Sequence, residues 1–196
     1  MKTHIIYCHP SNKSLTYQIK EKYIQALTDV GKEYTISDLY AKNFNSDMTE
    51  EEYLRESNYT LDTPSSDVLE EQKLLDEADN LTFIFPVFWL DCPSKLVGWF
   101  TRVFTYGYRY YSTEGKEQMK TYDNIIFIIT MGSGYKDLEA DGKISAIKTI
   151  FDVDRIKDKA RNTQFYIYTS TSHDKITDER KRKILDDVYK IGINSN

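Results

Sequence analysis

The chain has few cysteines and no long hydrophobic run. Its 196 residues include 2 cysteines, Cys8 and Cys92, which form neither a CxxC motif nor a zinc-ligand spacing. The sequence therefore indicates no metal site, and a reducing cytoplasmic location fits best. No stretch of about 18 apolar residues is present, so we expect no transmembrane helix.

The chain also lacks an excess of basic residues and a phosphate-binding glycine motif. Its formal net charge of −5 argues against a nucleic-acid-binding surface. Neither a Walker sequence nor a GxGxxG sequence occurs, so P-loop and Rossmann dinucleotide chemistry find no support. A hydrophobic fraction of 40% and a charged fraction of 29% exclude a disordered or membrane-embedded chain. The length suits a single domain that covers residues 1–196.

What the sequence does contain is an alternation of short apolar runs and amphipathic segments. Apolar runs predict strands at 3–8, 33–39, 81–85, 124–130 and 164–169. Hydrophobic spacing of three and four residues predicts helices at 15–31, 67–78, 93–104, 144–151 and 178–190, with a short one at 50–55. This alternation predicts an α/β fold with a parallel sheet and helices on both faces. Five strands predict the flavodoxin-like order 2-1-3-4-5.

In such a sheet, ligands bind beyond the carboxyl ends of the strands, where the strand order reverses. That rule selects the loop at 9–16 after the first strand. Ser11, Lys13 and Ser14 place hydroxyls and a cation directly before a helix, which favours an anion site. His9 could add a hydrogen-bond donor to a phosphate. The alternative is that Ser14 only caps the helix and His9 is a solvated loop residue.

Two further loops lie at the same predicted edge. The loop at 86–92 offers Phe88 and Trp89 as flat apolar walls, although a core or lid role is the alternative. The loop at 131–135 contains Gly132 and Gly134, which allow close approach of a ligand or form a plain tight turn. Together the three loops would offer a phosphate pocket, an aromatic wall and a glycine-rich edge. That combination suits a flavin mononucleotide.

The longest motif of the chain surrounds the third predicted strand. Its residues are Phe85, Pro86, Val87, Trp89, Pro93, Leu96, Gly98, Trp99, Phe100, Arg102, Val103 and Phe104, then Thr105, Gly107, Tyr108 and Tyr110. This pattern resembles the signature of the flavodoxin-like NAD(P)H quinone oxidoreductases, the family related to DT-diaphorase. The H-P-x-x-x-S-L-T block at 9–16 and the D-L-Y-A-x-x-F-N block at 38–45 resemble the same family.

The chain departs from the family pattern in the loop after the third strand. Leu90 stands where an aromatic residue is common, and Asp91 and Cys92 replace a pair that contains glycine. Ser46, Ser94 and Thr101 are further departures, as is Met131 in the loop after the fourth strand. A histidine that the family has near its active-site tyrosine has no counterpart at 136–142.

The resemblance implies a bound flavin that NADH or NADPH reduces and that a quinone, nitro or azo compound reoxidises. FMN is favoured over FAD because the chain is short and shows no extra C-terminal element for an adenosine half. The implied cofactor-binding residues are His9, Ser14, Leu15 and Thr16 for the phosphate and ribityl side, Pro86, Val87, Phe88, Trp89 and Leu90 along the ring, and Thr130, Gly132 and Ser133 at the pyrimidine edge.

The resemblance also implies a catalytic tyrosine, a substrate cleft and a homodimer. Tyr135 is the candidate for the tyrosine, and Tyr106, Tyr108 and Tyr110 would shape the cleft. The alternative for these three is a packed aromatic hairpin or a dimer contact. Two other functions stay open: a regulatory subunit of a potassium-efflux system, and a flavodoxin-type electron carrier. The aromatic residues after residue 105 count against the carrier.

Overall fold

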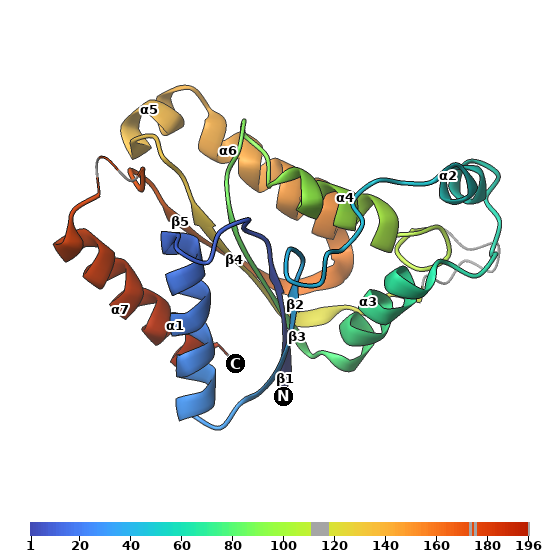
Figure 1. The fold of residues 1–196 in the computed structure, drawn as a ribbon, viewed down its shortest axis with the longest axis horizontal. Coiled ribbons are helices and arrows are strands. Elements are labelled where there is room, and N and C mark those ends of the chain that lie inside the picture. The colour runs from blue at the N-terminus through green and yellow to red at the C-terminus, as the bar shows by residue number, and fades with distance from the viewer. Residues whose placement is uncertain (111–117, 173, 175, 196) are drawn as a thin grey trace.

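The structure, a computed structural model, describes residues 1–110, 118–172, 174 and 176–195. It contains a five-stranded parallel sheet between two layers of helices (Figure 1). The strands are β1 (Lys2–Tyr7), β2 (Glu33–Asp38), β3 (Asn80–Pro86), β4 (Tyr122–Thr130) and β5 (Ala160–Tyr168). Their order is β2-β1-β3-β4-β5, and every neighbouring pair is parallel. The predicted flavodoxin-like fold is confirmed.

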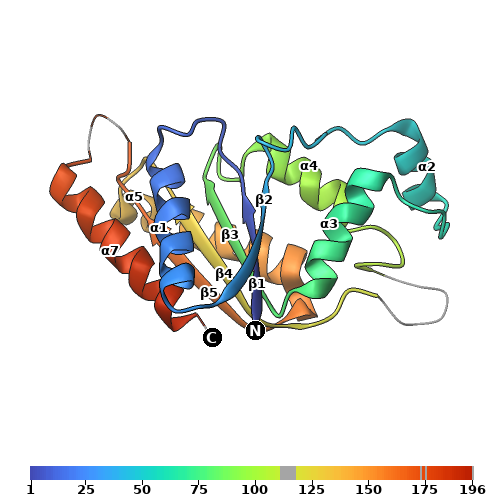
Figure 2. The ribbon, with the colours of Figure 1, turned by 60° about the horizontal axis from the view of Figure 1, so that its bottom comes forward.

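The helices lie on both faces of the sheet. They are α1 (Leu15–Asp29), α2 (Glu50–Ser57), α3 (Ser66–Glu77), α4 (Ser94–Val103), α5 (Tyr135–Ala140), α6 (Lys143–Lys148) and α7 (Asp178–Asn194). Helices α1 and α7 cover one face, and α3 and α4 cover the other (Figure 2). Within the described residues, no helix combines the length and the hydrophobicity that crossing a membrane requires.

Successive side chains of the strands point to opposite faces of the sheet and pack into two hydrophobic cores. Ile5 and Tyr7 of β1 pack on the side of α1 and α7, whereas Ile6 packs on the side of α3 and α4. All seven residues of β3 are buried, as expected for a central strand covered on both faces. Such strands show continuous apolar runs, which is why the sequence revealed them.

Polar caps define where several helices begin. The hydroxyl of Ser14 accepts a hydrogen bond of 3.0 Å from the N–H of Tyr17, and that of Thr177 accepts one of 3.2 Å from Arg180. Ser14 therefore caps α1, which is the alternative given for it above, and Thr177 caps α7. Ser65 precedes α3, but its hydroxyl donates to Glu52 over 2.9 Å instead of capping the helix.

The segment from 135 to 159 differs from the prediction of one helix at 144–151. It forms α5 and α6, then a π-helical segment η1 (Thr149–Ile156) and a 3₁₀ turn η2 (Lys157–Lys159). Gly142, with φ of +70°, separates α5 from α6. The buried residues Ile147, Phe151 and Ile156 then follow at spacings of four and five. A five-residue spacing fits a π-helix rather than an α-helix, so the α-helical pattern ended early.

Arg102 of the long motif holds the connection between β2 and α3 in place. Its buried guanidinium donates 2.6 Å hydrogen bonds to Glu52 of α2 and to Asp67 of α3. It also donates to the carbonyl of Asn45 over 2.7 Å. Helix α2 is thereby anchored although none of its own residues is buried. Arg102 therefore has a structural role, because it joins Asn45, α2 and α3.

Candidate functional site

Two adjoining pockets lie beyond the carboxyl ends of β1, β3 and β4. The first has a volume of about 520 Å³ and the second about 430 Å³. Val87 and Gly132 line both pockets, so the two form one continuous cleft. All the predicted cofactor-binding residues line one or the other: His9, Ser14, Leu15, Thr16, Pro86, Val87, Phe88, Trp89, Leu90, Thr130, Gly132 and Ser133. The structure thus brings together residues that are far apart in the sequence.

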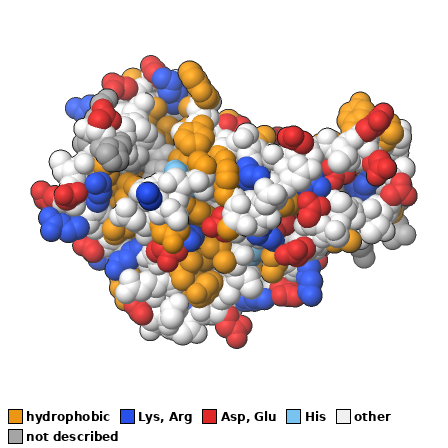
Figure 3. All heavy atoms as spheres, viewed as in Figure 1, with side chains coloured by type: hydrophobic (Ala, Val, Ile, Leu, Met, Phe, Trp, Pro, Cys, Tyr) orange, Lys and Arg blue, Asp and Glu red, His pale blue; other side chains and the backbone are white. Residues whose placement is uncertain are grey.

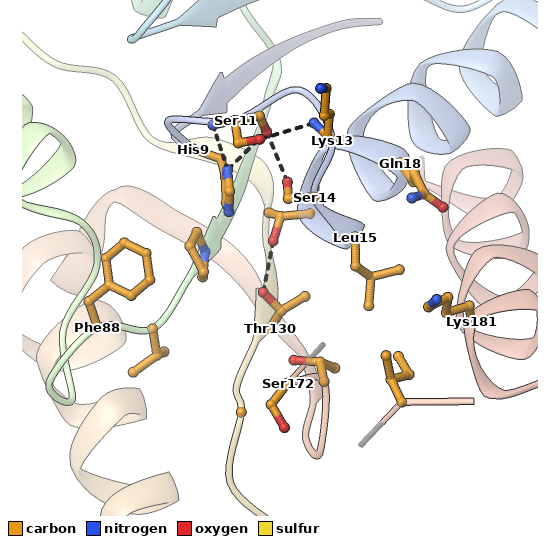
Figure 4. Close-up of a pocket in the computed structure, with 16 residues that line it drawn as sticks. His9, Ser11, Lys13, Ser14, Leu15, Gln18, Phe88, Thr130, Ser172 and Lys181 are labelled. Carbon is orange, nitrogen blue, oxygen red and sulfur yellow. Dashed lines mark hydrogen bonds between the residues drawn. The ribbon is translucent and has the colours of Figure 1, made fainter. Parts of the chain in front are cut away.

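The loop after β1 forms a polar end of the first pocket (Figure 4). Nδ1 of His9 lies 2.9 Å from the backbone nitrogen and 3.0 Å from the carbonyl oxygen of Ser11, so the loop holds the ring in place. Burial lowers the pKa of His9 and favours the neutral ring. In the described part of the chain, the N–H groups of Leu15 and Thr16 have no acceptor. Free N–H groups in the first turn of a helix attract anions.

Two lysines add positive charge to this pocket. Lys13 comes from the loop itself and Lys181 from α7, on opposite sides of Ser14 and Leu15 (Figure 4). The ammonium group of Lys181 pairs with Asp178 at 3.2 Å. The pocket is therefore suited to a phosphate.

Hydroxyl groups line the base of the first pocket. Thr16 and Thr130 share a buried hydrogen bond of 2.9 Å, which joins α1 to the end of β4 (Figure 4). The hydroxyl oxygen of Ser172 is shielded from solvent but has no partner among the described residues. A polar atom of this kind usually belongs to a ligand or an ordered water. A Cβ added to Gly132 would meet only the Cβ of Ser172, at 3.7 Å, so the glycine leaves open space here.

The loop after β3 forms a tight turn at the second pocket. Phe88 and Asp91 exchange two backbone hydrogen bonds, of 2.8 and 3.1 Å. Between them, Trp89 and Leu90 adopt left-handed φ angles of 51° and 69°. A turn of this type normally carries Asn-Gly, and each left-handed residue with a side chain costs about 1–3 kcal/mol. Strain of this kind is typical of functional sites.

The second pocket has apolar walls and polar hydrogen-bond donors. Trp89, Leu90, Met131 and Leu138 provide the walls. Among the residues that the structure describes, the N–H groups of Trp89, Leu90, Gly132 and Ser133 have no acceptor. The ammonium group of Lys143 also lines this pocket and pairs with Asp141 at 2.5 Å. This arrangement can hold a flat apolar ring and stabilise negative charge at its edge.

The predicted cleft tyrosines do not line either pocket. Tyr106 and Tyr108 are buried, and the hydroxyl of Tyr108 donates to Asp76 over 2.8 Å. The hydroxyl of Tyr110 donates to Glu56 of α2 over 2.5 Å. Within one chain these tyrosines connect α2 and α3 to the segment after α4. Their predicted role in a substrate cleft would thus need a second chain.

Tyr135 lies next to the cleft but does not line it. Its side chain is about half exposed, and its hydroxyl donates to Glu139 of the same helix over 3.0 Å. The neighbouring carboxylate raises the pKa of Tyr135. Its catalytic role stays a prediction.

Sequence analysis missed several residues that line the cleft. They are Gln18, Thr171, Ser172, Ile176 and Lys181 in the first pocket, and Met131, Leu138 and Lys143 in the second. Thr171 to Lys181 follow β5, and the loop after β5 must adjoin the loop after β4 in the predicted strand order. The predicted strand order therefore already indicated that residues of this loop could line the cleft. Lys143 could not be found, because the break between α5 and α6 was not predicted.

Comparison with known proteins places this geometry among related folds. The model of a family described as having a flavodoxin-like fold matches residues 1–185. NAD(P)H dehydrogenase [quinone] 1 of Rattus norvegicus is 37% identical over 146 residues, which cover 66% of this chain and 53% of the relative. Ribosyldihydronicotinamide dehydrogenase [quinone] of Homo sapiens is 32% identical over 123 residues, covering 56% and 53%. The chain spans about half the length of the curated relatives it matches.

One similar solved structure covers nearly the whole chain. It is an NAD(P)H:quinone oxidoreductase from Methanothermobacter marburgensis, with a TM-score of 0.89 and 32% identity. The similarity covers 100% of this chain and 96% of that one. The similarity therefore includes the loops at the cleft as well as the sheet.

Proposed function

The chain belongs to the flavodoxin-like NAD(P)H quinone oxidoreductase family, and on that basis we propose that it is a flavin-dependent oxidoreductase. It passes a hydride from NADH or NADPH, through a bound flavin, to a quinone or to a nitro or azo compound. Donor and acceptor use the second pocket in turn, in a ping-pong cycle. The continuous cleft, with an anion-binding end and an apolar end, is the observation that carries this proposal.

The polar end of the cleft fits the phosphate side of a flavin. The N–H groups of Leu15 and Thr16 are donors at this end, and the hydroxyl of Ser14 and the ring of His9 also line it. The unpaired hydroxyl of Ser172 gives the ribityl chain a partner. These residues would bind the phosphate and ribityl side.

The apolar end fits the flavin ring. Pro86 to Leu90 would lie along the ring, and Thr130, Gly132 and Ser133 would meet its pyrimidine edge. When bound, the flavin supplies hydride acceptance from NAD(P)H and hydride donation to the acceptor. The free N–H groups of Gly132 and Ser133 and the ammonium of Lys143 stabilise negative charge at this end, in the manner of an oxyanion hole.

We propose FMN as the flavin, with FAD as the alternative. Gln18 of α1 and Ile176 also line the first pocket and are the candidates for contact with the adenosine half of FAD. Heating the purified protein and identifying the released flavin by chromatography decides between the two. Oxidation of NADH or NADPH with menadione by the purified protein supports the enzyme, and a protein that takes up neither FMN nor FAD refutes it.

A homodimer would cover the exposed apolar side chains near the cleft. Phe88 of the first pocket and Trp89 of the second are exposed, and so are Tyr53, Leu54 and Tyr59 around α2. Figure 3 shows hydrophobic side chains at the surface over both regions. In the proposed dimer, the segment with Tyr106, Tyr108 and Tyr110 of one chain helps to shape the substrate cleft of the other. Sedimentation should then give about twice the 23.0 kDa mass of one chain.

A further inference from the structure

The turn that carries Trp89 and Leu90 is tied to the rest of the molecule by one ion pair. The carboxylate of Asp91 accepts two hydrogen bonds from the guanidinium of Arg155, of 2.9 and 3.1 Å. The same carboxylate accepts a 2.7 Å hydrogen bond from the N–H of Cys92. Asp91 is also the last residue of the turn, so the ion pair fixes the end of the turn directly. Paired hydrogen bonds of this kind set orientation as well as distance.

Contacts with two core aromatic rings and with Arg109 hold Arg155 in place. Its guanidinium lies 4.8 Å from the ring centre of Phe100 and 4.6 Å from that of Phe151, both in the core. The carbonyl of Arg155 accepts hydrogen bonds of 3.2 and 3.1 Å from Arg109. Arg155 lies in the π-helical segment η1, a conformation that frequently occurs at functional sites. The side chain of Arg155 is therefore held in one position, unlike that of an exposed surface arginine.

The position of this ion pair connects it to the cleft. Trp89 and Leu90, the two strained residues, line the second pocket and precede Asp91 directly. Their left-handed conformation lacks the Asn-Gly sequence that usually stabilises it. A contact outside the turn must hold these residues in place, and the described contacts of Asp91 provide one. Asp91 is also where the sequence leaves the family pattern.

We propose that the Asp91–Arg155 ion pair is a positioning device for the second pocket. It holds the turn Phe88–Asp91 in its left-handed form before any ligand binds, so that the walls and free N–H groups of Trp89 and Leu90 are already in place. The inference rests on the proposed flavin function and deepens it. Neither Asp91 nor Arg155 lines either pocket of the cleft, so both act through the turn.

The test uses Asp91→Asn and Arg155→Met, with the exposed Asp123–Arg161 pair as a control. Asp123→Asn and Arg161→Met remove the same groups from an ion pair of 3.0 Å at the start of β4 and β5, away from the cleft. Two quantities are measured in each variant. The first is amide hydrogen exchange at Phe88 and Asp91 in the flavin-free protein, compared with Ile128 in the core. The second is FMN affinity by fluorescence titration.

Loss of the ion pair should speed exchange at Phe88 and Asp91 and weaken FMN binding, each by about tenfold, or about 1.4 kcal/mol. Exchange at Ile128 and both quantities in the control variants should stay unchanged. Unchanged exchange at the turn in Asp91→Asn would overturn the proposal, and so would faster exchange with unchanged FMN affinity. If Arg155→Met does not fold, Asp91→Asn decides alone. Failure of the unmodified protein to bind either FMN or FAD would refute the flavin function, while the exchange data would still test the ion pair.

Discussion

At the scale of single residues, Ser14 combines a folding contact with a binding position. Its hydroxyl caps α1 and also lines the polar end of the first pocket. Thr49 makes the same kind of cap, a 3.2 Å hydrogen bond from Glu52, but lies outside both pockets. Comparing the two caps therefore distinguishes an effect on stability from an effect on ligand binding.

We expect Ser14→Ala and Thr49→Ala each to lower the free energy of unfolding by about 1 kcal/mol. Only Ser14→Ala should also weaken flavin binding, by about tenfold. In the proposed complex its hydroxyl turns from the carbonyl of Ser11 to the charged phosphate, and that hydrogen bond is lost. Urea unfolding and fluorescence titration measure the two effects. Equal flavin affinity in the two variants would show that Ser14 is only a cap.

Lys143 is the cation at the apolar end of the cleft. We expect Lys143→Met to reduce kcat by roughly tenfold with little change in the KM for NAD(P)H, because positive charge near the ring edge acts on the reaction more than on binding. The side chain is 43% exposed, so solvent screening limits the effect. Lys148→Met is the control, since Lys148 lies on the same helix but outside the pockets. Steady-state kinetics with menadione tests this, and equal kcat values for the two variants would contradict it.

His4 should make the stability of the protein depend on pH. Burial, together with the charges of Lys42 and Lys2, lowers the pKa of His4 from 6.5 to about 3. Below pH 6.5, His4 is protonated in the unfolded chain but stays neutral in the folded chain, so acid favours unfolding. Between pH 7 and pH 5 the unmodified protein should lose about 2 kcal/mol more stability than His4→Leu. Urea unfolding at both pH values measures this, and parallel losses would mean that His4 is protonated in the fold.

At the scale of elements, the turn after β4 shows how a glycine can serve binding rather than folding. A Cβ at Gly132 meets only open space near Ser172, whereas a Cβ at Gly98 of α4 would meet the carbonyl oxygen of Ser46 at 2.1 Å. The two glycines thus have different reasons to be present.

Gly132→Ala should leave the free energy of unfolding nearly unchanged but weaken flavin binding, because its methyl group enters the cleft. Gly98→Ala should instead destabilise the fold by about 1–3 kcal/mol through overpacking. Thermal unfolding and flavin titration of both variants provide the comparison. Normal flavin affinity in Gly132→Ala would place the ring away from this turn.

The elements themselves were largely predictable, and the reason lies in their burial. Strands β1, β3 and β4 are mostly buried, so their apolar runs are continuous and easy to recognise. The helix after β4 was not, because Gly142 breaks it and the five-residue spacing of Phe151 and Ile156 belongs to a π-helix. The predicted cofactor-binding residues lie together because strand ends fix their loops. Lys143 and the Asp91–Arg155 pair depend on that unpredicted segment.

At the scale of the whole molecule, the cleft exists because of the order of the strands. β1 lies beside β3, with Tyr7 opposite Ile84, and β3 lies beside β4, with Pro86 opposite Thr130. Three loops that are far apart in the sequence therefore meet at one edge of a rigid sheet. A regulatory subunit or an electron carrier could share this sheet, but rapid hydride transfer from NAD(P)H distinguishes the enzyme from both.

The most direct test of the flavin function is the anaerobic absorption spectrum of the purified, FMN-loaded protein. We predict the spectrum of a bound flavin, about one per chain, that NADH or NADPH bleaches and that added menadione restores. A protein that takes up no FMN or FAD, or whose bound flavin NADH and NADPH leave oxidised, would contradict the account.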